Sequence, residues 1–95
     1  MEDKTVLSDD EIKRSLPEGW KYRGNALHKS WYFGKFRDMP DFVIKAVHLM
    51  NDVNHHADIS MDTRTKTVKV SVTTHSEGRV TATDIDFAKK INEMN

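Results

Sequence analysis

The stretch Asn51-Asp52-Val53-Asn54-His55-His56-Ala57-Asp58-Ile59 decides how this chain folds. Before it, apolar residues recur at the three- and four-residue spacing of a helix, and after it they alternate with polar residues as in a strand. The two adjacent histidines stand at this junction, and loops between elements commonly carry functional groups. Imidazole has an unperturbed pKa of ~6.5, so it can give or take a proton near neutral pH. The junction is therefore the first candidate for a chemical site.

The segment before the junction predicts a long amphipathic helix that starts near Asp38. Asp38 can cap this helix, and Pro40 is tolerated in a first turn. Its main apolar stripe has i, i+4, i+7, i+11 spacing, with further apolar residues beside it. The stripe is formed by Phe42, Ala46, Leu49 and Val53, and the flanking residues are Val43, Val47 and Met50. An apolar face of this width predicts packing on a sheet, with a flank left for a partner helix.

Two strand-like runs follow the junction and are separated by a polar turn. The longer run, 67–75, places Val68, Val70 and Val72 on one face, which we expect to be buried. His75 belongs either to the opposite, polar face or to the exit of the strand. A third histidine thus stands at the end of an element, as His55 and His56 do.

The remaining segments predict two shorter helices and a hairpin. Ser8 and Glu11 have the spacing of a capping box, and so do Thr81 and Asp84. Between the first of these helices and the long one, residues 20–36 predict a hairpin that turns at Gly24-Asn25. In its second arm Leu27, Lys29, Trp31 and Phe33 would share one face, and Lys29 interrupts the apolar pattern of that face.

The order of these elements is α-β-β-α-β-β-α, which predicts an α+β, two-layer domain. Its sheet would be four-stranded and antiparallel, with the helices on one face. We expect a loose tail over residues 1–7 and a single domain over residues 8–95.

Composition excludes several functional classes. Fifteen Lys and Arg residues balance fifteen Asp and Glu residues, which argues against a general nucleic-acid binder. The absence of cysteine excludes a disulfide scaffold and a thiolate site. No apolar run approaches the ~18 residues of a membrane span, and the charged start of the chain does not resemble a signal peptide. We therefore expect a cytoplasmic protein.

A series of short motifs in a fixed order runs from Leu7 to the last helix. They are Leu7-Ser8-x-x-Glu11-Ile12, Gly19-Trp20, Ala26-Leu27-x-Lys29, Phe33-x-x-Phe36, Phe42-Val43-x-x-Ala46, Asn54-His55-His56-x-Asp58-Ile59, Val70-x-Val72-x-Thr74-His75 and Thr81-x-x-Asp84-Ile85-x-x-Ala88. Through these motifs, over about residues 7–92, the chain resembles the pterin-4a-carbinolamine dehydratases. One vertebrate member of that family is also the dimerization cofactor of a homeodomain transcription factor.

The resemblance implies an enzyme that dehydrates 4a-hydroxytetrahydropterin to quinonoid dihydropterin, the recycling step for tetrahydrobiopterin. It implies no metal and no organic cofactor. It also implies a homodimer or homotetramer that is located in the cytoplasm, with the nucleus possible too. Neither direct binding to nucleic acid nor binding to a membrane is expected. The alternative is a weak or inactive member that serves as a dimerization cofactor and binds a protein partner through its helical face.

The resemblance also assigns roles to residues of this chain. His55 and His75 become the acid and base candidates, and His56 becomes the residue that orients the pterin. The expected lining of the substrate site is Ala57, Thr74, Ser76 and Glu77, and Asp84 matches an acid that supports the site. Asp84 has a second expected role as the capping residue of the last helix.

Three positions depart from the family pattern. Ala57 stands where proline is usual, Thr65 where an aromatic residue is usual, and Asn51 where active members usually carry an ionisable residue. The change at Asn51 removes a carboxylate that could orient an imidazole, unless Asp52 or Asp58 takes its place.

A metal site is the alternative interpretation of the histidines, because His55, His56, Asp58 and His75 could all supply ligands. Adjacent histidines rarely converge on one ion, and the spacing matches none of the standard zinc patterns. We therefore predict no metal site. The other two histidines, His28 and His48, match no motif and are expected to be structural or exposed.

Overall fold

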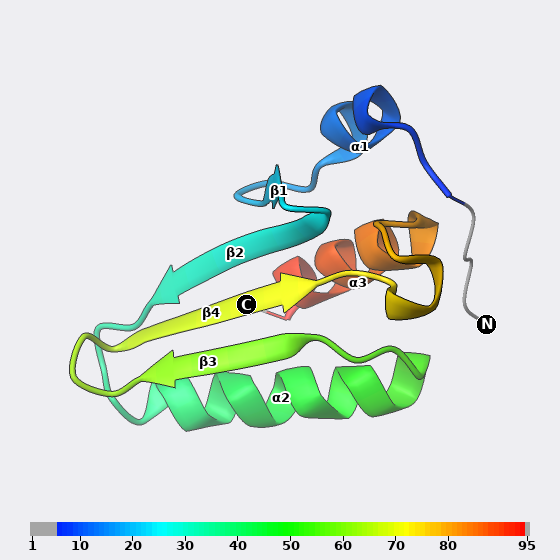
Figure 1. The fold of residues 1–95 in the computed structure, drawn as a ribbon. Coiled ribbons are helices and arrows are strands. Elements are labelled where there is room, and N and C mark those ends of the chain that lie inside the picture. Colours follow the sequence, from blue (N-terminus) through cyan, green and yellow to red (C-terminus); the bar gives the residue numbers. More distant parts are fainter. Residues whose placement is uncertain (1–5, 95) are drawn as a thin grey trace.

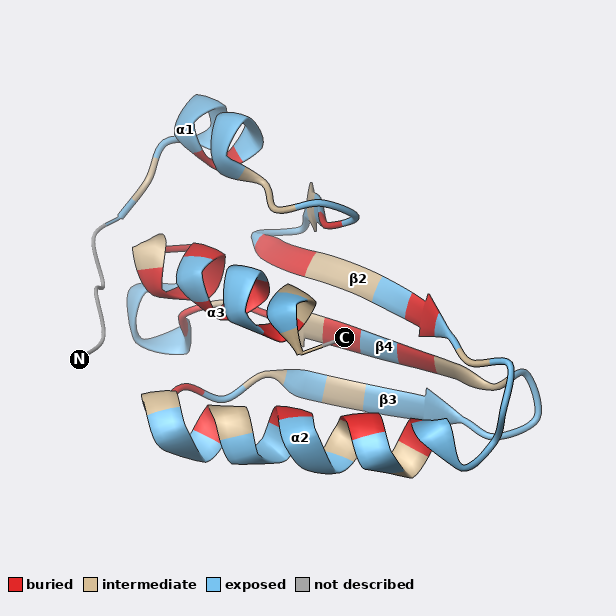
Figure 2. Ribbon diagram, turned by 180° about the vertical axis from the view of Figure 1, so that it is seen from behind, coloured by how far each residue is buried: buried red, intermediate tan, exposed pale blue. Residues whose placement is uncertain are grey.

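The described part of the chain, residues 6–94 of a computed structural model, forms three α-helices and a four-stranded antiparallel sheet (Figure 1). The elements are α1 (Asp9–Ser15), β1 (Lys21–Arg23), β2 (Ala26–Tyr32), α2 (Asp38–Val53), β3 (Asp58–Asp62), β4 (Thr67–Val72), the 3₁₀ turn η1 (His75–Glu77) and α3 (Ala82–Glu93). The strands lie in the order β1-β2-β4-β3. Helices α2 and α3 lie on one face of the sheet, and α1 lies beside β1 (Figures 1 and 2). The predicted α+β class and element order are confirmed.

The register of the sheet follows from its two hairpins. Gly24 and Asn25 connect β1 to β2, and both have positive φ, 59° and 60°. Two left-handed residues are what a two-residue hairpin turn requires, so the predicted turn is confirmed. Strand β4 pairs with β2 on one side and with β3 on the other. In the pairing with β3, Asp58 lies opposite Ser71. This register fixes which loops meet at each end of the sheet.

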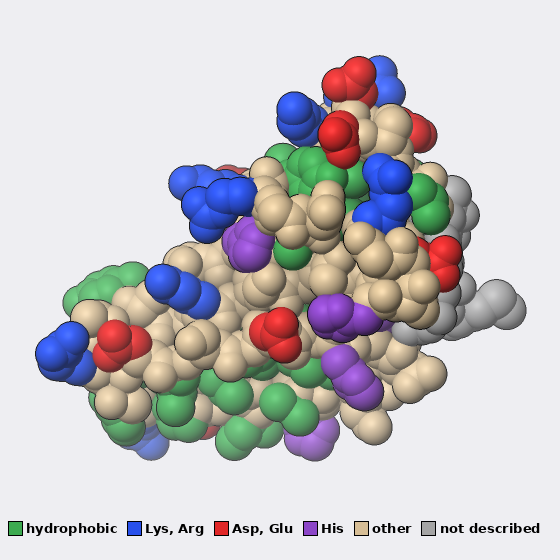
Figure 3. Space-filling view, in the orientation of Figure 1, with side chains coloured by type: hydrophobic (Ala, Val, Ile, Leu, Met, Phe, Trp, Pro, Cys, Tyr) green, Lys and Arg blue, Asp and Glu red, His purple; other side chains and the backbone are tan. Residues whose placement is uncertain are grey.

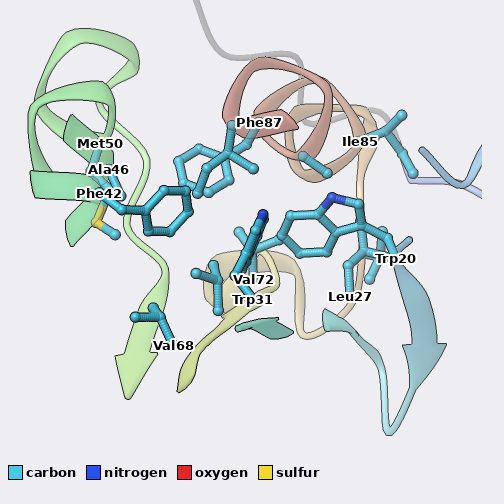
Figure 4. Packing of buried hydrophobic residues seen from close by; sticks show 14 of the residues in the cluster. Trp20, Leu27, Trp31, Phe42, Ala46, Met50, Val68, Val72, Ile85 and Phe87 are labelled. Atoms are coloured by element: carbon cyan, nitrogen blue, oxygen red, sulfur yellow. The ribbon is translucent and has the colours of Figure 1, made fainter. Parts of the chain in front are cut away.

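The core lies between the sheet and the two long helices (Figure 4). Val68, Val70 and Val72 of β4 are each at most 1% exposed, as their alternation predicts. Trp31 of β2 packs against Phe42 of α2, with their ring centroids 4.8 Å apart. Helix α3 contributes Ile85, Phe87, Ala88 and Ile91 to the same cluster. The apolar faces of both layers therefore meet in one core.

Lys29 lies on the buried face of β2, where its charge interrupts the apolar pattern of the strand. Its ammonium donates to the backbone oxygen of Glu18 (3.1 Å) and to Oδ1 of Asn92 (2.8 Å). It also lies 4.9 Å from the centre of the Trp31 ring. Oxygen partners and an aromatic face satisfy the cation at the border of the core. Lys29 thus ties β2 to the end of α3.

Helix α2 begins at Asp38, the residue that was predicted to cap it. Arg37 is the N-cap residue and already has helical backbone angles, and no side chain caps it. The backbone N–H groups of Asp38 and Met39 donate to the carbonyls of Lys35 and Phe36 instead. The prediction that Asp38 caps the helix is wrong, because the preceding turn winds directly into it. Asp38 is the first helical residue.

Helix α1 is held by its capping box and by contacts with the chain around it. Glu11 donates its N–H to Ser8 Oγ, and its carboxylate accepts from the Ser8 N–H, as predicted. Just before this helix, Val6 forms a backbone bridge with Thr81, and the Leu7 carbonyl accepts from the Arg79 guanidinium (2.9 Å). Of the predicted tail, residues 1–5 lie outside the described residues, as does Asn95 at the other end.

Candidate functional site

The junction between α2 and β3 sends its two histidines in different directions. Asn54 adopts the left-handed conformation (φ 53°, ψ 44°) and ends α2. The backbone N–H of His55 then donates to the Met50 carbonyl at 3.1 Å, which holds the chain close to the end of the helix. His55 is 7% exposed and its ring lies edge-on to Phe87 of α3, with centroids 6.2 Å apart. His56 is exposed.

A compact loop carries the second candidate segment from β4 into α3. Thr74 is buried and pairs with Arg79 through backbone hydrogen bonding. Between them lie η1 and Gly78, whose φ of 68° closes the turn. His75 begins η1 and is exposed. Of the two predicted positions for His75, the structure selects the exit of the strand.

Asp84 joins these two segments inside the protein. Its Oδ1 lies 2.6 Å from His55 Nε2, and its Oδ2 accepts from the Thr74 hydroxyl at 2.8 Å. The same Oδ2 accepts from the backbone N–H of Thr81 at 2.8 Å, which completes the reach-back of the predicted capping box. The hydroxyls of Thr74 and Thr81 are also 2.8 Å apart. Asp84 is fully buried, and both of its oxygens have partners, as a buried carboxylate requires.

The contact between Asp84 and His55 determines what His55 can do chemically. An ionised carboxylate can only accept hydrogen bonds, so His55 presents a hydrogen on Nε2 to it. A carboxylate that fixes the orientation of an imidazole is a common arrangement in acid–base catalysis.

The exposed histidines lie at the same end of the sheet as this buried pair. Because Asp58 pairs with Ser71, the residues just before β3 and those just after β4 leave the sheet together. His56 belongs to the first of these segments and His75 to the second. Figure 3 shows two neighbouring histidine side chains on this part of the surface. Exposed imidazoles therefore border the position where His55 and Asp84 meet below the surface.

The described residues give no support to the metal interpretation. Between residues 6 and 94, no three His, Cys, Asp or Glu side chains are grouped so that they could hold one metal ion. His55 is engaged with Asp84, whereas His56 and His75 are exposed. In the same part of the chain, no helix is long and apolar enough to cross a membrane.

Comparison with known proteins identifies the family. Residues 5–94 match the family model described as pterin 4 alpha carbinolamine dehydratase. The chain belongs to the pterin 4α-carbinolamine dehydratase family. The relatives include a protein of Sulfolobus acidocaldarius that is 39% identical over 90 residues, covering 93% of this chain and 97% of that protein. A protein of Mycobacterium avium is 39% identical over 89 residues, covering 92% and 93%. Both carry the name "Putative pterin-4-alpha-carbinolamine dehydratase".

Two solved structures resemble this member of the dehydratase family. A transcriptional coactivator/pterin dehydratase from Brucella melitensis superimposes with a TM-score of 0.83 at 28% identity, covering 93% of this chain and 96% of that chain. A pterin dehydratase-like protein described as a RuBisCO assembly factor of the alpha-carboxysome gives a TM-score of 0.68 at 19% identity, covering 81% and 89%. The second likeness shows the shared fold alone.

In this dehydratase-family chain, the structure brings three of the predicted site residues into direct contact, namely His55, Thr74 and Asp84. The other predicted residues surround them on the same two segments. They are His56, Ala57, His75, Ser76 and Glu77, of which Ala57 is half-buried and the rest are exposed. The sequence pattern indicated Thr81 only as a cap, and the contact of its hydroxyl with Thr74 was not predicted. The available signal was its position three residues before Asp84.

The residues that depart from the dehydratase pattern lie at different distances from this site. Asn51 is exposed in the last turn of α2, and Asp52 beside it is exposed too. The carboxylate that contacts the first histidine comes from Asp84 instead. Thr65 lies in the turn between β3 and β4, at the opposite end of these strands from the histidines. The Thr65 departure is therefore remote from the site.

Proposed function

We propose that this protein dehydrates 4a-hydroxytetrahydropterin to quinonoid dihydropterin. In this reaction the C4a–O bond breaks, the hydroxyl leaves as water after it gains a proton, and a pterin nitrogen loses a proton as its double bond to C4a forms. The reaction needs one proton donor and one acceptor, and each positioned group of this kind typically contributes ~10²–10⁴-fold. Family membership supports the reaction class. The observation that carries the proposal is the meeting of the two histidine segments through Asp84.

The proposal assigns a separate task to each histidine. His55 and His75 exchange the two protons, and His56 orients the pterin at the surface. Asp84 acts through His55, since it holds the ring in place. The pterin is lined by Ala57, Thr74, Ser76 and Glu77, which lie next to the histidines in the chain. The residues of this chain supply both proton transfers, so the proposal includes no metal or organic cofactor.

The test is the dehydration of chemically generated 4a-hydroxytetrahydropterin by the purified protein, followed by ultraviolet absorbance against the uncatalysed reaction. We expect a clear acceleration that is proportional to protein concentration. A folded protein, verified by circular dichroism, that gave only the background rate would contradict the proposal.

A role in binding other protein chains is the second candidate, and an exposed apolar patch on α2 favours it. Ile44 and Val47 point away from the core and are 55% and 52% exposed. They lie three residues apart, so they share one face of the helix. Exposed apolar side chains grouped in this way mark contact surfaces. We propose that this face joins copies of the chain into a homodimer or homotetramer in the cytoplasm. A different protein partner on this face is the alternative.

A further inference from the structure

The face of the sheet away from α2 and α3 carries an open groove of about 460 Å³. All four strands contribute to its lining, which includes Arg23, His28, Ser30, Asp58, Lys69 and Ser71. This volume lies within the ~300–1,000 Å³ of small-molecule sites. Figure 3 shows lysine and arginine side chains bordering a largely uncharged strip of this face.

The groove begins at the end of the sheet that carries the histidines. Its first row of cross-strand neighbours is His28, Ser71 and Asp58, and the next row contains Lys69. Successive residues on one face of a strand are ~7 Å apart, so Lys69 lies ~13 Å along β4 from the level of Thr73, which is two residues before His75. A ligand that occupies both the histidine end and the groove must therefore be longer than a pterin ring alone.

The charges in the groove favour an anion beside Lys69, which lies one row beyond Asp58 and Ser71. The side chains of Arg23 and Lys69 are exposed and have no hydrogen-bond or ion-pair partner within residues 6–94. His28 is occupied by a hydrogen bond between its Nε2 and the Arg23 carbonyl (2.9 Å). Asp58 is the one carboxylate of the lining and stands in the row nearest the histidines. A negative group that extends along β4 would consequently be repelled by Asp58 and attracted toward Lys69 in the next row.

We propose that this groove holds the ring substituent of the pterin substrate, and that the preferred substrates carry a long, negatively charged substituent. The inference rests on the proposed dehydratase function and adds the class of substrate. The pterin ring lies at the histidine end, the substituent follows β4 past Ser71, and its anionic end contacts Lys69. Arg23 lines the groove from the edge strand β1, where it pairs with Ala26. The hydroxyls of Ser30 and Ser71 offer hydrogen bonds along this path.

The test compares two substrates whose substituents differ in length and charge. One is the 4a-hydroxy derivative of 6-methyltetrahydropterin, and the other is that of tetrahydrofolate, which carries a p-aminobenzoylglutamate group. We expect kcat/KM to be about two- to five-fold higher for the anionic substrate, the size typical of exposed charge contacts. High salt should reduce this preference, since it screens such contacts.

Single-charge variants locate the effect. Lys69→Gln and Arg23→Gln should each lower the preference for the anionic substrate while turnover of the methyl substrate stays unchanged. The matched control is Lys89→Gln, which removes an exposed positive charge from α3 on the other side of the sheet. It should leave the preference as in the wild type.

Each other outcome has a distinct meaning. If the methyl substrate is turned over but the anionic one is not preferred, or if neither groove variant alters the preference, the groove inference is wrong and the dehydratase proposal stands. If the folded protein accelerates neither substrate, the proposed function fails and the groove inference fails with it.

Discussion

Asp84 performs two tasks at once at the scale of single residues. It caps α3 through the backbone N–H of Thr81, and it holds His55, which lies 29 residues earlier in the chain. Its Oδ2 also accepts from the Thr74 hydroxyl. A buried carboxylate with a donor at every contact is costly to alter, because each donor would lose its acceptor. Asp84 therefore links the stability of α3 to the orientation of a candidate catalytic group.

Replacing Asp84 with asparagine should damage both tasks. An amide can accept at only one of the two positions, so at least one of the donors loses its partner. If the amide nitrogen faces His55, the ring must accept at Nε2 and move its hydrogen to Nδ1. We expect Asp84→Asn to lower the dehydration rate at least ten-fold and the free energy of unfolding by ~1–3 kcal/mol.

The matched control for this variant is Asp86→Asn, which changes an exposed carboxylate two residues further along the same helix. It should leave the rate and the denaturation midpoint close to those of the wild type. Equal rates for the two variants would show that Asp84 does not support His55 in the reaction.

At this scale the sequence predicted local contacts better than contacts between distant segments. The spacing of Thr81 and Asp84 indicated the cap, because a capping box is local. The contact of Asp84 with His55 depends on how the α2–β3 loop packs on α3, which no local pattern specifies. Lys29 shows the same limit. Alternation predicted that it shares a face with Leu27 and Trp31, but its oxygen partners come from Glu18 and Asn92.

At the scale of elements, a hydrogen bond between the side chains of Tyr22 and Asp9 connects α1 to the sheet. The Tyr22 hydroxyl of β1 donates to Asp9 Oδ1 at 2.8 Å. This hydrogen bond raises the pKa of Tyr22, with burial and the charge of Asp9 acting in the same direction and Arg79 opposing them. The hydroxyl is the form that donates, so the contact needs Tyr22 to be protonated. The stabilisation is fully present below the unfolded-state pKa and is lost as pH rises through the higher, folded-state pKa.

A tyrosine titration tests this contact. The chain has two tyrosines, so Tyr32→Phe leaves Tyr22 as the sole source of phenolate absorbance. In this background we expect the Tyr22 midpoint to lie above ~10, the value for a free tyrosine. Adding Asp9→Asn should lower the midpoint, because the charged acceptor is gone. A midpoint unaffected by Asp9→Asn would mean that the contact between α1 and β1 does not form.

The bounds of an element were predictable where a local sequence signal sets them. They were less predictable where a neighbouring turn forms hydrogen bonds with the start of the element. The prediction of a turn at Gly24-Asn25 was correct because Gly and Asn tolerate the positive φ that a two-residue hairpin turn requires. The Asp38 cap was wrong because the preceding turn supplies its own carbonyl partners to the helix start. The end of α2 at Asn54 matched the expected change of period, since Asn tolerates the left-handed conformation.

At the scale of the whole molecule, pairing of the strands decides where the functional groups meet. The sequence predicted two layers, because the apolar periodicities of helices and strands indicated opposed buried faces. It did not predict that β4 lies between β2 and β3. That order places the loop before β3 beside the loop after β4, and so brings the histidine segments together. Because α2 and α3 both cover one face of the sheet (Figure 1), the other face stays open and forms the groove.

The apolar face of α2 predicts self-association of the molecule. We expect the wild type to sediment as a dimer or tetramer and Ile44→Lys or Val47→Lys to shift it toward smaller species, because each places a charge in the proposed contact. Analytical ultracentrifugation at several concentrations measures this directly. The control is Lys89→Glu, a charge change on the exposed face of α3 that should leave the distribution as it is. A wild type that is monomeric at every concentration would contradict the prediction.

The most direct test of the proposed histidine acid–base catalysis compares dehydration rates under identical conditions. The variants His55→Ala, His75→Ala and His48→Ala are measured beside the wild type. His48 is an exposed histidine of α2 and serves as the control for loss of an imidazole away from the site. We predict at least a ten-fold lower rate for His55→Ala and for His75→Ala, with unchanged circular dichroism, and a wild-type rate for His48→Ala. Wild-type rates in both site variants would show that the histidines at this end of the sheet do not carry out the proton transfers.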